Sequence, residues 1–179
     1  MPDLDIPVAF VPASAHGLPG RLGFAPAPGR WRVEAGVAPG AAIDEDLRRL
    51  RRTCASSALV TLLERDEMSA IGLADLLERV SSAGFESLWF PIPDGAAPSD
   101  LESMALLVAQ IVERLAAGRT VIVHCHGGVG RSGTIAACVL VAAGLTPERA
   151  LEVVRRARAA AATAPGQEEF VHEFAQAQR

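Results

Sequence analysis

The sequence contains no lysine and no tyrosine, and aromatic residues make up only 4% of its 179 residues. All of its basic residues are therefore arginine, the formal net charge is −4, and no long basic run occurs. Binding along a nucleic-acid backbone depends on clustered Lys and Arg, so we expect no general nucleic-acid surface. An anionic substrate can still be bound at one local positive site.

Cysteines are few, and their number is odd: three, without the spacing of a disulfide framework. This pattern favours a reducing compartment, and we expect a cytoplasmic location. Residues 1–14 lack a basic segment followed by an apolar core, so they are not expected to be a secretion signal. The longest apolar run, residues 135–145, is shorter than the ~20 residues of a membrane-spanning helix, so no membrane span is expected.

Half of the residues are hydrophobic and 21% are charged, which is a globular composition. The length suits a single domain over residues 1–179. Residues 6–12 could form a short strand, whereas residues 13–42 are rich in Gly, Pro and Ala. We therefore expect residues 1–42 to be an extended region that packs on a core of about 43–177.

Helices and strands alternate after residue 42. Apolar runs predict buried strands, and amphipathic patterns with capping residues predict helices. The expected strands are 58–63, 87–90 and 120–123. A helix from Asp44 to about Ala55 precedes the first strand, and two helices divided near Gly72 and ended by Gly84 precede the second. An irregular proline-rich segment at 91–98 and a helix to Ala117, opened by a Ser99–Glu102 capping box, precede the third.

The last third of the sequence predicts helices only. Residues 132–144 are apolar nearly all round, as in a central buried helix. Thr146 and Pro147 open another helix that includes the alanine run 159–162 and ends near Ala161, and a last helix follows Pro165. The expected fold class is α/β, with a small central sheet flanked by helices and a helical C-terminal third.

One stretch, VIVHCHGGVGRSGT at residues 121–134, follows a predicted strand and precedes a predicted helix. Its glycines have the G-x-G-x-x-G spacing of a dinucleotide-binding turn. That function also requires an acidic residue about 20 positions on, at the end of a second strand. Here this position falls at Glu152 and Val153, within a predicted helix. A Walker A loop is excluded because its lysine is absent.

A nucleophilic cysteine accounts for the same stretch better. Cys125 ends the strand, and the pKa of a thiol falls at a helix N-terminus beside positive charge. The glycines at 127, 128 and 130 allow backbone N–H groups to converge on an anion. Arg131 offers a planar fork to two phosphate oxygens, and Ser132 can donate to the sulfur. This combination predicts attack by the thiolate on phosphorus.

The alternative is a small buried cysteine beside a tight glycine turn. That interpretation leaves Arg131 unexplained, because an arginine has no reason to close an apolar passage. We therefore expect the catalytic function.

His124-Cys125, five further residues and Arg131-Ser132 resemble the signature of cysteine-dependent protein tyrosine and dual-specificity phosphatases. Residues 59–68, 90–99 and 166–174 also resemble segments of the phosphatases associated with cyclin-dependent kinases. The resemblance implies a protein tyrosine phosphatase-like fold. It also implies hydrolysis of phosphomonoesters through a phosphocysteine intermediate, with no cofactor.

The resemblance also implies that Asp94, in the proline-rich loop, is the general acid on a mobile loop. Locally, Asp94 could be an ordinary turn residue in the sequence PDG. Gln167 resembles a residue that orients the hydrolytic water, or it is a solvent-facing amide at a helix start. His124 stiffens the loop near the cysteine, or it is a plain structural histidine.

The sequence thus gives a full set of expected site residues. They are Cys125, Asp94, Arg131 and Ser132 as catalytic residues; His126, Gly127, Gly128, Val129, Gly130 and Arg131 for substrate binding; and His124 and Gln167 in support.

Several other reactive or charged residues stand outside this set. Cys138 is expected in the core; Cys54 is either core or a resolving partner for an oxidised Cys125. His16 and His172 have no ligand spacing around them, so no metal site is expected. The arginines at 155, 156 and 158 form a basic group that is either a solvated face or an aid to an anionic partner.

The expected partner is a phosphorylated protein or a small phosphomonoester. No segment resembles the aromatic recognition loop of larger tyrosine-specific enzymes, which favours a shallow, dual-specificity pocket. Phosphoinositide phosphatases of this superfamily often carry lysines in the loop, whereas this loop reads His-Gly-Gly-Val-Gly. A phosphoinositide or other small phosphomonoester remains one alternative, and a non-catalytic phosphoprotein-binding module is another.

Overall fold

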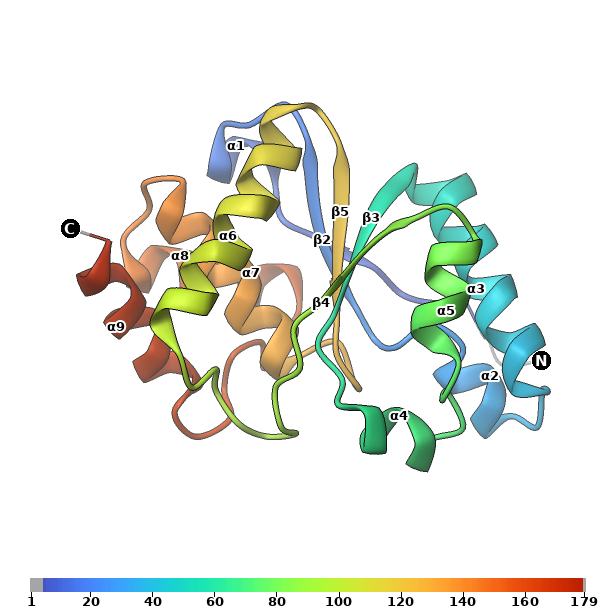
Figure 1. Cartoon of the computed structure of the whole chain (residues 1–179). Coiled ribbons are helices and arrows are strands. Elements are labelled where there is room, and N and C mark those ends of the chain that lie inside the picture. Colours follow the sequence, from blue (N-terminus) through green and yellow to red (C-terminus); the bar gives the residue numbers. More distant parts are fainter. Residues whose placement is uncertain (1–4, 179) are drawn as a thin grey trace.

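The computed structural model describes residues 5–178 and shows a central sheet with helices on both faces (Figure 1). Within these residues the sheet has five strands in the order β1-β2-β5-β3-β4. β1 is antiparallel to β2, and every other pair is parallel. The strands are β1 (Ala9–Phe10), β2 (Arg21–Ala25), β3 (Ser56–Thr61), β4 (Glu86–Trp89) and β5 (Thr120–His124).

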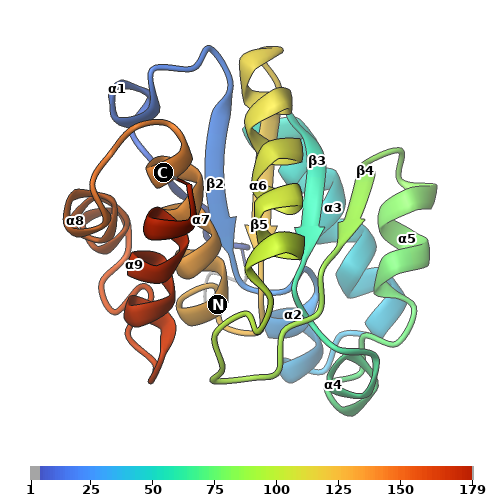
Figure 2. The same cartoon turned by 60° about the vertical axis from the view of Figure 1, so that its left-hand side comes forward.

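Two groups of helices cover the sheet. α6 to α9 lie on one side, and α3 and α5 lie on the other; Figure 2 shows α6 passing in front of β5. The helices are α1 (Ala13–His16), α2 (Arg30–Glu34), α3 (Pro39–Cys54), α4 (Arg65–Ala70), α5 (Leu76–Ser82), α6 (Leu101–Ala116), α7 (Gly130–Ala142), α8 (Pro147–Ala157) and α9 (Gln167–Ala177). No helix of the described part is both long and apolar enough to cross a membrane.

Each face of the sheet contributes to a separate hydrophobic cluster. Val121 and Val123 of β5 belong to the cluster under α6–α9, whereas Ile122 belongs to the cluster under α3 and α5. This alternation is the two-residue period of a strand, and burial on both faces explains the continuous apolar run. The expected α/β fold with a small sheet between helices is confirmed.

Most of the expected elements are present. The three predicted strands correspond to β3, β4 and β5, and α4 and α5 lie on either side of the predicted break near Gly72. The Thr146 side chain caps α8 by accepting from the Arg149 N–H at 3.4 Å. No strand follows His124 within residues 5–178, which agrees with the predicted helical last third.

The expectation of an extended region over residues 1–42 is wrong for the segments that form α1, α2 and the first turn of α3, and for residues 21–25. Residues 21–25 form β2 beside the central strand β5. Gly20 and Gly23 explain why the sequence pattern does not predict this strand. A Cβ on Gly20 would lie 2.4 Å from the Arg119 carbonyl oxygen, and one on Gly23 would lie 2.8 Å from the side chains of Ile122 and Val8. These glycines therefore allow neighbouring segments to pack closely against β2, and they do not interrupt the strand. Residues 1–4 of the same expected region lie outside the described residues.

Two helix starts also differ from the predictions. α3 begins at Pro39, so Asp44 lies inside the helix and forms an ion pair with Arg79 at 2.9 Å. α6 is capped by Asp100, not by Ser99: the Asp100 carboxylate accepts from the N–H groups of residues 102 and 103 at 3.2 and 3.0 Å. A carboxylate one position later satisfies the same free N–H groups.

The alanine run 159–162 is not helical, although its composition favours a helix. α8 ends at Ala157, and Ala160 and Ala162 have φ values of 62° and 53°. The turn packs on α7, where a Cβ on Gly133 would lie 2.8 Å from the Cβ of Ala161. Tertiary contact therefore overrides helix propensity here.

Candidate active site

The loop from Cys125 to Arg131 joins two buried elements at the carboxyl end of β5. Cys125 follows β5 directly and is only 3% exposed, and α7 begins at Gly130. The loop therefore lies in front of a helix N-terminus, where backbone N–H groups and the helix dipole favour an anion. It forms the floor of a pocket of about 390 Å³ lined by Arg30, Asp94, Gly95, Cys125, His126, Gly127, Val129, Gly130, Arg131, Ala160, Thr163, Ala164 and Gln167.

The carbonyls of residues 126–129 all accept hydrogen bonds from surrounding structure. The pairs are Ala27 N and Arg30 Nη1 to His126 O (3.2 and 3.3 Å), Arg158 Nη1 to Gly127 O and Gly128 O (3.3 and 3.1 Å), and Gly133 N and Ala162 N to Val129 O (3.1 and 3.4 Å). In a planar trans peptide the N–H points opposite to the carbonyl. The N–H groups of residues 127–130 are therefore directed away from the scaffold and toward the pocket, as an anion cradle requires.

Arg158 lies behind this cradle and not on a solvated face. Its Nη2 also donates to the Pro7 carbonyl at 3.0 Å, so it ties the N-terminal segment to the loop. Burial lowers the pKa of Arg158, and the electrostatic interaction with nearby Cys125 opposes that effect. Arg155, by contrast, pairs with Glu168 at 2.6 Å, and Arg156 with Glu152.

Gly128 is the position in the loop that most requires glycine. Its φ is +68°, and a Cβ there would lie 2.3 Å from backbone atoms of both Ala25 and Pro26. Ala25 is the last residue of β2 and Pro26 follows it, so this strand, which is not expected from the sequence, also supports the cradle.

Replacing Gly128 by alanine should lower the free energy of unfolding by about 2 kcal/mol or more, because it adds both backbone strain and a clash with backbone. Urea denaturation measures this loss. Gly127→Ala is the matched control: its Cβ would meet only Arg30 Nη1, at 3.8 Å. Equal stability of the two variants would contradict the close approach at Gly128.

Two buried side chains flank the cysteine. Ser132 is fully buried, and its Oγ lies 3.4 Å from Cys125 Sγ. His124 is also fully buried, with Nε2 2.8 Å from Thr61 Oγ1. Burial lowers the pKa of His124 to about 3, assisted by the positive charge of Arg131, so the ring is neutral at physiological pH. His124 thus joins β5 to β3 directly before the loop.

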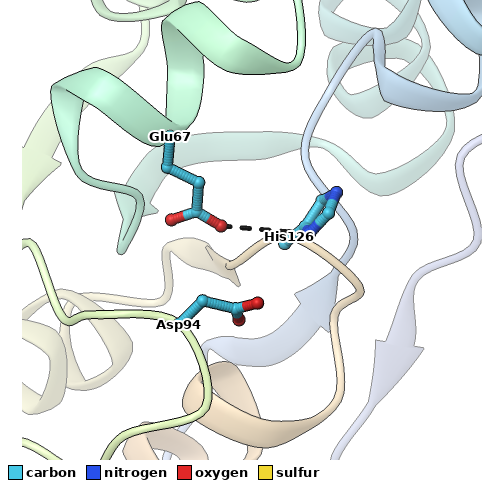
Figure 3. A group of neighbouring side chains, drawn as sticks. All are labelled: Glu67, Asp94 and His126. Atoms are coloured by element: carbon cyan, nitrogen blue, oxygen red, sulfur yellow. Dashed lines mark ion pairs between the residues drawn. The ribbon is translucent and has the colours of Figure 1, made fainter.

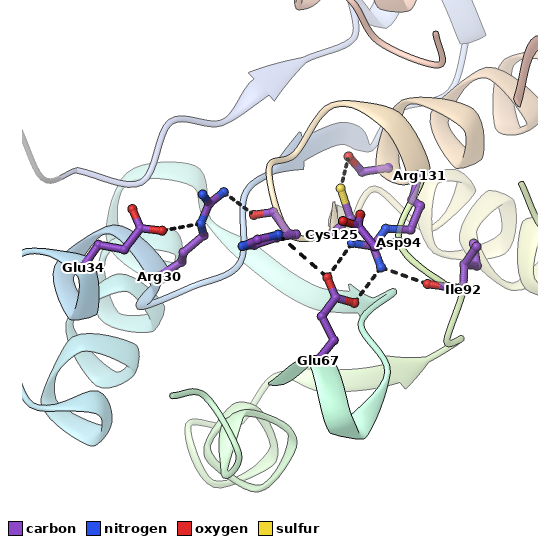
Figure 4. Close-up of polar contacts among 9 residues, drawn as sticks. Arg30, Glu34, Glu67, Ile92, Asp94, Cys125 and Arg131 are labelled. Atoms are coloured by element: carbon purple, nitrogen blue, oxygen red, sulfur yellow. Dashed lines mark hydrogen bonds and ion pairs between the residues drawn. The ribbon is translucent and has the colours of Figure 1, made fainter. Parts of the chain in front are cut away.

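Arg131 is 2% exposed, and each of its Nη atoms makes two hydrogen bonds (Figure 4). Nη1 donates to Glu67 Oε2 at 2.7 Å and to the Ile92 carbonyl at 2.8 Å. Nη2 donates to Glu67 Oε1 at 2.7 Å and to Asp94 Oδ1 at 2.8 Å. Burial lowers the pKa of Arg131, but the hydrogen bonds to Glu67 and the electrostatic interactions with Cys125, Glu67 and Asp94 outweigh burial, so the net shift is upward. The guanidinium is therefore charged and fixed in one plane.

Glu67 is a site residue that the sequence does not single out. It lies on α4 and holds Arg131 through both carboxylate oxygens. A signal exists, because a buried arginine needs a carboxylate and Glu67 falls in the resembling segment 59–68. The same segment also contains Glu64 and Asp66, and only the fold shows which carboxylate reaches the arginine.

Asp94 lies where the resemblance implies an acid. It stands in the irregular loop between β4 and α6, its side chain is 68% exposed, and it lines the same pocket as Cys125. The structure therefore brings the expected acid and the expected nucleophile to the lining of one pocket.

Three potential metal ligands meet at this edge of the pocket. One ligand atom each from Glu67, Asp94 and His126 lies within 4.8 Å of the others, and His126 Nδ1 is 3.9 Å from Glu67 Oε1 (Figure 3). Such a set can hold a cation. Here the Arg131 guanidinium already binds both carboxylates, so it provides the positive charge that a metal ion would otherwise supply.

Gln167 begins α9 and is fully buried, so the interpretation as a solvent-facing amide is wrong. Its Nε2 donates to the Ala96 carbonyl at 2.9 Å, and its Oε1 accepts from the Ala164 N–H at 3.2 Å. The side chain lines the pocket and reaches the loop that carries Asp94.

The other cysteines lie away from the site. Cys54 ends α3, just before Ser56, which pairs with Thr120 at the opposite end of β5 from Cys125. The length of that strand, roughly 16 Å, excludes Cys54 as a resolving partner. Cys138 is buried within α7, and burial raises its pKa, as in a core thiol.

Comparison with known proteins agrees with this geometry. Residues 35–145 match the family model described as "Polymorphic toxin system, DSP-PTPase phosphatase". Cyclin-dependent kinase inhibitor 3 of Sus scrofa is 30% identical over 135 residues, which are 74% of this chain and 63% of that protein. The chain thus spans 63% of the length of that curated relative.

Two solved structures are also similar. Kinase-associated phosphatase, with its catalytic-site cysteine substituted by serine, gives a TM-score of 0.86 at 26% identity, over 97% of this chain and 96% of that one. Tk-PTP in its active form gives 0.71 at 30% identity, over 94% and 96%. The match to the family model covers more than half of the chain, and on this basis the chain belongs to the dual-specificity family of cysteine-dependent phosphatases.

Proposed function

We propose that this protein hydrolyses phosphomonoesters through a phosphocysteine intermediate. The observation that carries the proposal is the position of Cys125 at the floor of a cradle whose N–H groups point inward, beside a fixed Arg131. Converging N–H groups bind three phosphate oxygens and leave the phosphorus in front of the sulfur.

In the first step, the Cys125 thiolate attacks phosphorus and the bond to the leaving oxygen breaks. The cradle N–H groups and Arg131 hold the non-bridging oxygens, where negative charge collects. Asp94 gives its proton to the leaving oxygen, so the alcohol or phenol departs neutral.

In the second step, water attacks the phosphocysteine and the S–P bond breaks. Asp94, now a carboxylate, accepts the proton from that water. Ser132, 3.4 Å from the sulfur, donates a hydrogen bond to the departing thiolate. Inorganic phosphate leaves, and the enzyme returns to its starting protonation state.

The substrate we propose is a phosphorylated protein, on tyrosine or on both tyrosine and serine or threonine. The small pocket of about 390 Å³ and the absence of lysine from the loop support this class over phosphoinositides. Three free thiols within the described residues fit the proposed cytoplasmic location.

Hydrolysis of 4-nitrophenyl phosphate at mildly acidic pH, with reductant and a metal chelator present, tests the proposal. We expect turnover, and acid quenching during turnover should leave one phosphoryl group on the peptide that contains Cys125, as detected by mass spectrometry. Turnover that requires a divalent metal would contradict this chemistry. A folded, reduced protein that binds phosphopeptides without consuming them would instead be a binding module.

A further inference from the structure

We propose that Gln167 is a positioning residue for the general acid: it holds the downstream half of the acid loop, residues 91–98, and so fixes Asp94 over the cradle. This inference rests on the proposed phosphatase function. It differs from the role implied by the resemblance, because it assigns Gln167 to the first chemical step and not to the water of the second.

The orientation of the Gln167 amide is fixed by its two partners. Ala96 offers a carbonyl, so it requires the N–H end of the amide, and Ala164 offers an N–H, so it requires the oxygen end. Reversing the amide would set its oxygen against the Ala96 carbonyl and its NH₂ group against the Ala164 N–H. A fully buried amide with both ends satisfied is a rigid connection.

The acid loop is held on both sides of Asp94. Two residues before it, the Ile92 N–H donates to the Leu62 carbonyl at 3.0 Å, and the Ile92 carbonyl accepts from Arg131 at 2.8 Å. Two residues after it, the Ala96 carbonyl accepts from Gln167. Asp94 therefore lies midway between an anchor on Arg131 and an anchor on Gln167.

The loop itself does not supply the second anchor. The Ala96 N–H turns back to Pro93 at 3.1 Å, which bonds the loop only to itself. Gly95, with a φ of +72°, is a flexible joint directly after the acid. Without the Gln167 bond, the segment after Asp94 loses its hydrogen bond to the body of the protein.

Gln167 also contacts the cradle. A Cβ on Gly130 would lie 3.0 Å from both Nε2 and Oε1 of the amide, so the side chain rests directly on the first residue of α7. One side chain thus spans from the cradle to the acid loop. The contacts of Gln167 with Gly130 and Ala96 therefore help to set the distance between the Cys125 sulfur and Asp94.

This arrangement has a specific kinetic consequence. kcat/KM reports the steps up to formation of the phosphocysteine, whereas hydrolysis of that intermediate affects kcat. A poor leaving group needs the acid in the first step more than a good one does. A misplaced Asp94 should therefore slow phenyl phosphate more than 4-nitrophenyl phosphate.

Gln167→Met, which keeps the side-chain length and removes both hydrogen bonds, tests the inference. We expect kcat/KM to fall about tenfold or more for phenyl phosphate and by less than about threefold for 4-nitrophenyl phosphate, since a positioned acid contributes roughly 10²–10⁴-fold. In an Asp94→Asn background the same change should have little further effect.

Gln167→Asn provides a second variant, because it keeps a polar amide that is one methylene too short to reach Ala96. The thermal midpoint and the affinity for inorganic phosphate show that either variant is folded with its cradle intact. Equal losses on the two esters would overturn the inference. So would an unchanged kcat/KM with a lower kcat and accumulating phosphoenzyme, which would assign Gln167 to the water. Absence of turnover in the wild-type protein would overturn the proposed function itself, a distinct outcome.

Discussion

Replacement of Cys125 by serine should lower kcat by roughly 10⁴-fold or more, while inorganic phosphate still binds. A serine hydroxyl ionises far less readily than a thiol, so it supplies no nucleophile at neutral pH. The cradle N–H groups and Arg131 are unchanged by the substitution, because their positions depend on bonds outside residue 125. Steady-state hydrolysis gives kcat, and isothermal titration with phosphate gives the affinity.

Cys54→Ser is the matched control. Its thiol is also buried, but it lies at the far end of the sheet, so we expect wild-type turnover. Substantial turnover by Cys125→Ser, or loss of turnover in Cys54→Ser, would contradict the assignment of the nucleophile.

Replacement of Arg131 by lysine should lower kcat/KM by about 10³-fold, although the charge is retained. An ammonium is a point charge and cannot make the four bonds that the two Nη atoms make to Glu67, Ile92 and Asp94. The loss therefore has two causes: the guanidinium charge that Glu67 fixes beside the phosphate is displaced, and the acid loop loses its upstream anchor.

Hydrolysis of 4-nitrophenyl phosphate measures this effect, with Arg149→Lys, an exposed residue on α8, as the control. The Arg131→Lys variant should also lose affinity for phosphate, which Cys125→Ser should not. A loss of less than about tenfold would show that charge alone suffices, against the expectation for a planar guanidinium held in place by both oxygens of Glu67.

The sequence predicts the elements that carry long apolar runs and misses one that does not. β3 and β5 are recognisable because both of their faces are buried. β2 lies beside β5 as β3 does, but Gly23 within it and Gly20 directly before it lie where neighbouring atoms leave no room for a Cβ. Composition alone cannot distinguish such a strand from an irregular segment.

The same distinction applies to the site. Residues 124–132 are consecutive, so their pattern is visible in the sequence, and Asp94 is placed by resemblance. Glu67, Arg30 and Arg158 reach the loop from α4, α2 and the end of α8. Glu67 falls in a resembling segment and Arg158 in a basic group, but neither pattern indicates that the side chain contacts the loop. Their roles depend on contacts between distant segments, which only the fold specifies.

The position of β2 also sets the order in which the protein can assemble. Arg21 pairs with Thr120, so the central pairing of the sheet joins segments from opposite halves of the chain. At ribosomal rates of about 5–20 residues per second, β2 is synthesised roughly 5–20 s before β5. During that interval the short β1 is its only strand partner among residues 5–178. Because Gly128 lies against Ala25 and Pro26, the cradle depends on this late pairing for its support, so we expect it to take its final shape only after β5 has joined β2.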